Sequence, residues 1–199
     1  MTATVAAVAF VVSCGNKLKE AEPLDLTVTP IQVVDNMFAV ESQNGKVGRR
    51  IESDRMERYD NDTCTVEKFL GSFSLYSYNQ EGLLETVILA DRAEHFNSKS
   101  RKDEYWLVYG NVSLQNVIKQ ETAETDSLYW DITFGRIYTD CYVKMYSSDG
   151  VMQGYGMQAD DKGYDATINK PFNSYSVVVQ DTTKVLVDSV NFIGPIVKK

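Results

Sequence analysis

The chain is poor in the residues on which many enzymes and metal proteins depend. Its 199 residues include one histidine, three cysteines and four prolines. A single histidine, His95, excludes a site built from several histidines and leaves a histidine-based catalytic dyad only one position. The sequence also lacks a Gly-x-Ser-x-Gly elbow, a phosphate-binding loop and a His-Glu-x-x-His motif. We therefore expect a protein that is not an enzyme, with no catalytic residues, no metal site and no cofactor.

Positive charge is scarce as well. The chain has 20 Lys and Arg against 28 Asp and Glu, which gives a formal net charge of −8. Affinity for nucleic acid depends on clustered Lys and Arg that neutralise phosphates, and the sequence has no such cluster. We therefore expect no nucleic-acid partner. For the same reason, an anionic lipid would have to be held mainly through its apolar part.

No apolar run in the sequence reaches the roughly 20 residues that a membrane-spanning helix needs. The run from Val5 to Val12 instead has the length of the apolar core of a signal peptide. Val11-Val12-Ser13-Cys14 then resembles a bacterial lipobox, so we expect a signal peptide at 1–13 and a lipid anchor on Cys14. No Lys or Arg precedes Lys17, which leaves open a start codon farther upstream. The alternative is a cytosolic N-terminal strand or helix.

The composition divides the remaining chain into three parts. Residues 14–35 are mostly polar and are expected to form a lipidated tether between the membrane and the domain. Residues 36–165 carry strand patterns and are expected to form one domain. Residues 166–199 are a C-terminal extension with strand patterns at Tyr175 to Val179 and Lys184 to Val190. Twelve Tyr and eight Phe across the chain favour strands over disorder.

Within the central part, apolar and polar residues alternate with the period of two that is typical of a half-buried strand. The clearest run covers residues 136–145, and the runs at 69–75 and 106–114 alternate in a similar way. In the clearest run, one face is expected to carry Ile137, Thr139, Cys141, Val143 and Met145.

Turn signals separate these runs. Asn44-Gly45 predicts a hairpin between residues 41 and 50, and further turns are expected at 79–82 and 147–150. Residues 90–98 fit either a short helix or a bend. Cys64 and Cys141 fit either a disulfide in an oxidising compartment or two small buried thiols.

The chain also repeats itself. Residues 51–60 match residues 88–97, and each copy has an apolar residue three places before an aspartate, Asp54 or Asp91. Weaker echoes end at Asp131 and Asp160. Their unequal spacing argues against a strict solenoid and fits a sheet of repeated strand pairs. Each aspartate is expected to end a strand and make turn hydrogen bonds, whereas paired acid/base carboxylates are the alternative.

Four sequence phrases, in order, resemble a known family. They are A-D-R-A-E at 90–94, Y-G-N-V-S-L at 109–114, I-Y-T-D-C-Y-V at 137–143 and G-Y-G-M-Q-A-D at 154–160. This ordered set resembles the LptC family of lipopolysaccharide export proteins and its OstA/LptA-like relatives, here in a lipoprotein form. The resemblance implies an all-β fold, a twisted open β-jellyroll of repeated antiparallel strands with a V-shaped apolar groove. Lipid on Cys14 would replace the transmembrane helix of familiar members.

The resemblance also implies a function. It predicts a periplasmic protein at the inner membrane that accepts lipopolysaccharide from an ABC transporter with LptF/LptG-type subunits. Such a protein passes the lipid along a bridge of LptA-like or LptD-like jellyrolls joined by strand-edge addition. The alternative is an envelope lipoprotein with a β-sandwich that binds protein or carbohydrate and carries no lipid.

The alternation nominates the residues that would line the lipid-binding groove. The same residues also fit a closed core in which they pack only against one another, because a period-two apolar face marks burial and not cargo. The nominated residues are Phe73, Leu75, Ile88, Ala90, Trp106, Val108, Val112, Leu114, Leu128, Trp130, Cys141, Val143, Met145 and Met157.

Overall fold

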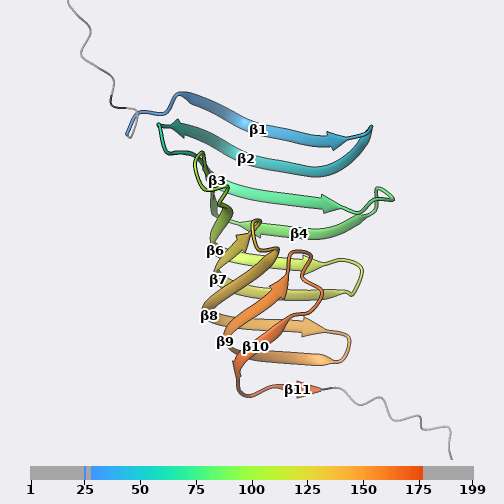
Figure 1. Cartoon of the computed structure of the whole chain (residues 1–199). Helices are drawn as coiled ribbons and strands as arrows, with labels where there is room; N and C mark the ends of the chain where they lie inside the picture. Colours follow the sequence, from blue (N-terminus) through green and yellow to red (C-terminus); the bar gives the residue numbers. More distant parts are fainter. Residues whose placement is uncertain (1–24, 26–27, 177–199) are drawn as a thin grey trace, which may run out of the picture.

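The structure, a computed structural model, describes Asp25 and residues 28–176, and this part of the chain folds into eleven antiparallel strands without a helix (Figure 1). The all-β prediction is confirmed. One sheet has the order β1-β2-β3-β4-β6-β7-β8-β9-β10, with β5 between β3 and β6 and β11 beside β9. The strands are β1 (Gln32–Gln43), β2 (Lys46–Asp60), β3 (Cys64–Tyr78), β4 (Leu84–Ala90), β5 (Arg92–Ser98), β6 (Glu104–Asn116), β7 (Glu121–Asp131), β8 (Arg136–Ser147), β9 (Gly150–Asp160), β10 (Thr167–Pro171) and β11 (Tyr175–Ser176).

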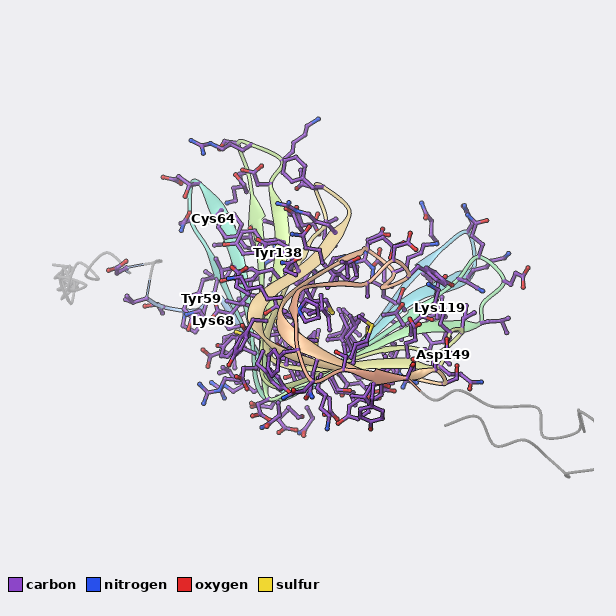
Figure 2. The ribbon with its side chains drawn as sticks, turned by 90° about the horizontal axis from the view of Figure 1, so that it is seen from below. Tyr59, Cys64, Lys68, Lys119, Tyr138 and Asp149 are labelled. Carbon is purple, nitrogen blue, oxygen red and sulfur yellow. The ribbon has the colours of Figure 1, made fainter. Side chains whose placement is uncertain are left out.

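The sheet is folded along a line that crosses its strands. Figure 2, which views the strands from below, shows two arms that diverge from a common base. We call them the β5 arm and the β4 arm, each formed by that strand and the halves of the longer strands in line with it. Cys64 and Tyr138 lie on the β5 arm, and Lys119 and Asp149 lie on the β4 arm. This is the twisted open sheet with a V-shaped section that the family resemblance implied.

Aspartate–glycine pairs bend the sheet at the base of the V. Asp54 lies at a register shift in β2 and faces Gly71 of β3, which has a φ of 93°. Asp91 separates β4 from β5 and faces Gly110 of β6, which has a φ of 79°. A Cβ on either glycine would lie 2.5 Å or 2.7 Å from the facing carboxylate. Glycine is needed there because L-residues rarely adopt positive φ and no space exists for a side chain.

The internal repeat has a direct structural meaning. Its two copies lie on opposite sides of β3 and pair with the same residues of that strand. Leu75 pairs with Ile51 on one side and Ile88 on the other, and Phe69 pairs with Met56 and Ala93. The copies therefore occupy equivalent positions about one central strand, and each carries its aspartate to the bend.

The aspartates of the repeat only partly follow the prediction. Asp131 and Asp160 end β7 and β9, and their carboxylates accept hydrogen bonds from turn amides of Phe134 and Tyr164 at 3.1 Å and 2.6 Å. Asp54, however, lies inside β2, so the prediction that it ends a strand is wrong. The reason is the bulge: β2 continues past the bend, whereas the equivalent strand is interrupted at Asp91.

The turn predictions are confirmed. Asn44 and Gly45 connect β1 to β2 with φ values of 54° and 77°, as a tight hairpin requires. Residues 79–83 connect β3 to β4, and Ser148 and Asp149 connect β8 to β9. Residues 90–98 form a bend followed by β5, and not a helix. Strand β1 begins at Gln32, within the segment expected to be a tether.

The two cysteines in the described part of the chain are free thiols. Cys64 begins β3, and Cys141 lies where β8 bulges at the bend, with its sulfur 3.2 Å from Ser127 Oγ. Cys141 is half-buried, whereas Ile137, Thr139 and Val143 of the same predicted face are buried. The bulge turns the backbone at Cys141 and so interrupts the regular alternation.

Several predictions concern residues outside the described part. The signal peptide at 1–13, the lipid anchor at Cys14 and the strand at 184–190 lie there. Of the expected strand at 175–179, Tyr175 and Ser176 form β11, and the rest lies outside the described residues. The extension from residue 166 also contributes β10, which pairs with β9.

Candidate functional site

The space between the two arms is filled by apolar side chains from both of them. Twelve of the fourteen residues nominated for the groove are buried there. Ala90 is half-buried against the same cluster, and Cys141 is half-buried at the bend. Leu128, Val143 and Met157 have no measurable exposure. The residues nominated for the groove therefore form a packed interior, in which side chains of the two facing arms contact one another.

The arms meet through side chains and not through backbone pairing. All extensive contacts between strands are between hydrogen-bonded neighbours in the sheet. Arg49 at one end of β2 nevertheless lies over the Trp130 ring of β7, with 5.5 Å between the guanidinium carbon and the ring centroid. These residues lie on different arms and several strands apart, so this contact bridges the V. Such an interior can separate without loss of sheet hydrogen bonds.

Aromatic rings line the inner face of the β5 arm. Phe69 and Phe73 lie 5.4 Å and 5.7 Å from Trp106, measured between ring centroids, and His95 stacks on Trp106 at 4.4 Å. Trp130 is the register partner of Trp106 on β7. Directly opposed residues of a sheet point to the same face, so both indoles face the interior. They provide wide, stiff apolar surface, which suits contact with flexible hydrocarbon.

A polar cluster borders this aromatic surface. His95 Nδ1 lies 3.1 Å from Glu67 Oε2, and His95 Nε2 lies 3.0 Å from Glu104 Oε1. Arg58 Nη1 lies 3.9 Å from Glu67 Oε1. The hydrogen bond with His95 lowers the pKa of Glu67 from its ordinary value, although partial burial opposes this shift. The cluster thus keeps an ionised carboxylate at the border of the interior, and sequence reasoning did not find it.

The loop between β9 and β10, residues 161–166, leaves the β5 arm at Asp160, reaches the β4 arm, and returns at Thr167, which pairs with Gln158. The backbone oxygen of Lys162 accepts hydrogen bonds from Thr86 Oγ1 at 3.2 Å and Asn116 Nδ2 at 3.4 Å. The Tyr164 hydroxyl donates to Glu85 Oε1 at 2.9 Å, and this bond raises the pKa of Tyr164. We call this segment the strap, because it links the two arms by polar contacts.

Both ends of the sheet expose apolar side chains. The outer edge of β1 has no strand beside it among the described residues, and Phe38 and Val40 of β1 are 65% and 47% exposed. At the other end Tyr155, Phe172 and Tyr175 are exposed. An uncovered strand edge offers unpaired backbone groups to another chain. These ends are therefore suited to strand addition.

The groove nomination left out part of the interior, including Ile137, which had been placed on an apolar face, and sequence reasoning did not find the polar cluster. The missed core residues lie mostly on strands whose alternation is interrupted by a bend, where a period-two pattern changes phase. Glycines inside strand patterns, such as Gly71 and Gly110, were the available signal for those bends. The core residues that the groove nomination left out are Met56, Phe69, Ala93, Ala123, Ile137, Ala159 and Ile168.

The described part of the chain holds neither a metal-binding cluster nor a membrane-spanning helix. Across residues 28–176, no group of three or more His, Cys, Asp or Glu is arranged to hold a metal ion. No helix in that part is long and apolar enough to cross a membrane.

Comparison with known proteins gives one family. The profile of the family described as lipopolysaccharide-assembly, LptC-related, matches residues 3–171. The match includes every strand from β1 to β10 and thus both arms of the V. None of the curated proteins compared with the chain is a match.

Proposed function

The chain belongs to the LptC-related lipopolysaccharide-assembly family and acts in lipopolysaccharide transport in the cell envelope, and we propose that it does so as a passive carrier. It accepts lipopolysaccharide from an inner-membrane ABC transporter and passes it to a neighbouring β-jellyroll. The acyl chains occupy the interior between the arms. The alternative, an envelope lipoprotein that binds protein or carbohydrate without lipid, is not favoured by the family.

The observation that carries this proposal is the interior itself. It is a continuous apolar cluster drawn from both arms, and the arms are joined by side-chain contacts and the strap. Acyl chains can replace contacts between apolar side chains at little net cost, because burial is favourable by about 25 cal/mol per Å² for either partner. An acidic chain with a net charge of −8 fits a carrier that holds the apolar part of an anionic lipid.

A photo-crosslinking residue in place of Val143 tests the cargo site. Val143 is buried in the interior, and its neighbour Lys144 points to the opposite face of the sheet, so Lys144 is the matched control. In cells we expect a lipopolysaccharide adduct at position 143 and none at 144. Absence of an adduct at 143, with the protein folded and at normal abundance, would contradict the carrier proposal.

We further propose that the two sheet ends dock partners by strand addition. LptF/LptG-type transporter subunits and an LptA-like or LptD-like jellyroll are the partners, each at one end. Crosslinkers at Phe38 on β1 and at Tyr155 on β9 should each capture one of these partners. Capture at Tyr129, an outward-facing residue far from either end, would contradict docking through the edges.

The last element of the proposal is a lipid on Cys14 that holds the protein at the periplasmic side of the inner membrane. One acyl chain binds membranes only marginally, whereas two or more give stable anchoring. The Cys14→Ala variant should move to the soluble periplasmic fraction, as followed by fractionation and blotting. A variant that stays with the membrane would show that another anchor is present.

A further inference from the structure

Four buried side-chain donors have no hydrogen-bond partner among the described residues: Nε of Arg50, Nε of Arg58 and the indole N–H groups of Trp106 and Trp130. Only the two indoles belong to residues of the apolar interior, where Trp106 and Trp130 are 3% and 7% exposed. Burial of a donor without a partner is unfavourable, and more than nine in ten buried polar groups in proteins are hydrogen-bonded. Both tryptophans face the space between the arms. Two such donors on adjacent strands therefore indicate a place where an acceptor binds.

The position of the two indoles restricts what that acceptor can be. They lie where the aromatic surface meets the polar cluster, since His95 stacks on Trp106 and Arg49 lies over Trp130. A lipid that fills the interior with its acyl chains would place the oxygen-rich linkage next to those chains at this border. The site is thus suited to the first polar atoms of an otherwise apolar ligand.

The charges around the indoles favour a neutral acceptor over a phosphate. Arg49 Nε lies 3.4 Å from Glu41 Oε2, and Arg58 is already near Glu67. Glu104 adds a third carboxylate on the other side of His95. The three carboxylates therefore outnumber the two arginines around the indoles, and the local charge does not favour a phosphate, which would need a positive partner on leaving water. Neutral N–H donors pair well with neutral carbonyl oxygens.

We propose that the Trp106 and Trp130 indoles form a subsite for fatty-acyl carbonyl oxygens, which binds the ester and amide linkages of the cargo. This inference rests on the proposed carrier function and adds a way to set the depth of the lipid. The acyl chains extend into the interior, the carbonyls stop at the indoles, and the headgroup stays outside. Acyl esters occur in lipopolysaccharide and in glycerophospholipids, so the subsite recognises a linkage common to both.

The composition of the chain makes this subsite measurable. The protein has only two tryptophans, so ¹⁵N labelling gives two indole signals. The folded protein would be titrated with lipopolysaccharide, with diacyl phosphatidylglycerol and with its dialkyl ether analogue, which differs only in lacking carbonyls. We expect lipopolysaccharide and the ester lipid to shift both indole N–H protons downfield. The ether lipid should leave them nearly unshifted and bind about 3- to 10-fold more weakly per lost hydrogen bond.

Variants separate a binding role from a packing role. Trp106→Phe and Trp130→Phe keep an aromatic ring and remove the donor, so each should bring the ester-to-ether affinity ratio toward one. Phe73→Leu also alters the aromatic surface but removes no donor, so it should leave that ratio unchanged. If a tryptophan variant fails to fold, the indole shifts of the unaltered protein still decide the question.

The outcomes are distinguishable. If lipopolysaccharide binds without shifting the indole signals, and the ester-to-ether affinity ratio is the same in both tryptophan variants as in the unaltered protein, the subsite is refuted. The carrier proposal would remain intact. A response to the phospholipid alone would assign the subsite to glycerophospholipid esters and contradict its role in the cargo. Failure of lipopolysaccharide to bind at all, together with no adduct at Val143, would refute the carrier function itself.

Discussion

The bend of the sheet provides a sharp test of how this sequence sets its shape. Gly110 has a φ of 79°, and a Cβ there would lie 2.7 Å from Asp91 Oδ2 and 2.9 Å from Asp91 Cβ. Asp91 cannot easily move, because Asn111 Nδ2 donates to its carboxylate at 2.8 Å and its own amide donates to the Gly110 oxygen at 2.9 Å. Gly110→Ala therefore adds a steric clash to the strain of positive φ.

The two contributions can be separated with a control. Gly82 has a similar φ of 83°, but a Cβ there has no neighbour within 4 Å. Gly82→Ala should lower the free energy of unfolding by about 1–2 kcal/mol, the strain of a left-handed conformation alone. Gly110→Ala should lower it by about 2–5 kcal/mol, since overpacking adds about 1–3 kcal/mol. For a domain of this size the difference corresponds to a Tm lower by roughly 2–12 °C.

Urea unfolding followed by the fluorescence of the two tryptophans measures both variants in the same assay. The double variant Asp91→Gly with Gly110→Ala removes the clash and keeps the strain, so the two changes should be coupled by about 1–3 kcal/mol. Equal destabilisation by Gly110→Ala and Gly82→Ala would refute the assignment of the Asp91–Gly110 contact as a tightly packed bend.

Leu128 is fully buried, so Leu128→Ala should lower the free energy of unfolding by about 2–5 kcal/mol in the same assay, and a smaller loss would indicate a loosely packed interior. The pKa of Glu67 is lowered in the folded state, so its stabilising effect is present above its ordinary value of 4.5 and is lost as the pH falls through the folded pKa. The stability difference between the unaltered chain and Glu67→Gln should therefore shrink at acidic pH, and a constant difference would contradict the His95 contact as its cause. Tyr164→Phe removes the hydrogen bond to Glu85, so amide exchange of the strap should rise while that of β3 stays unchanged; equal effects on both would argue against local opening.

Much of the fold was predictable because it follows from local patterns. The period-two runs predicted the strands, and the turn signals at Asn44-Gly45, 79–82 and 147–150 predicted the turns. The repeat at Ile51 and Ile88 also reflected a real equivalence, since both residues pair with Leu75. These signals depend on residues close in sequence, and turn geometry and side-chain alternation fix them without knowledge of the rest of the chain.

Some of the candidate site was beyond such reasoning. His95, Glu67 and Glu104 come from three strands, and no spacing in the sequence indicates that they meet. The strap contacts β4 and β6 from a loop that follows β9, so its role depends on distance in space and not along the chain. Asp54 was predicted to end a strand, like every aspartate of the repeat, and only the bulge shows that β2 continues.

The sequence by itself determined that this is an all-β protein of the LptC-related family, and it identified most residues of one apolar face. It could do so because strand, turn and face are local properties of residue type and order. Only the tertiary structure decided that this face is folded onto itself as a packed interior. The fold of the V brings Arg49 over Trp130 and leaves two indole donors without a partner among the described residues, because contacts between arms depend on the bend angle and twist of the whole sheet.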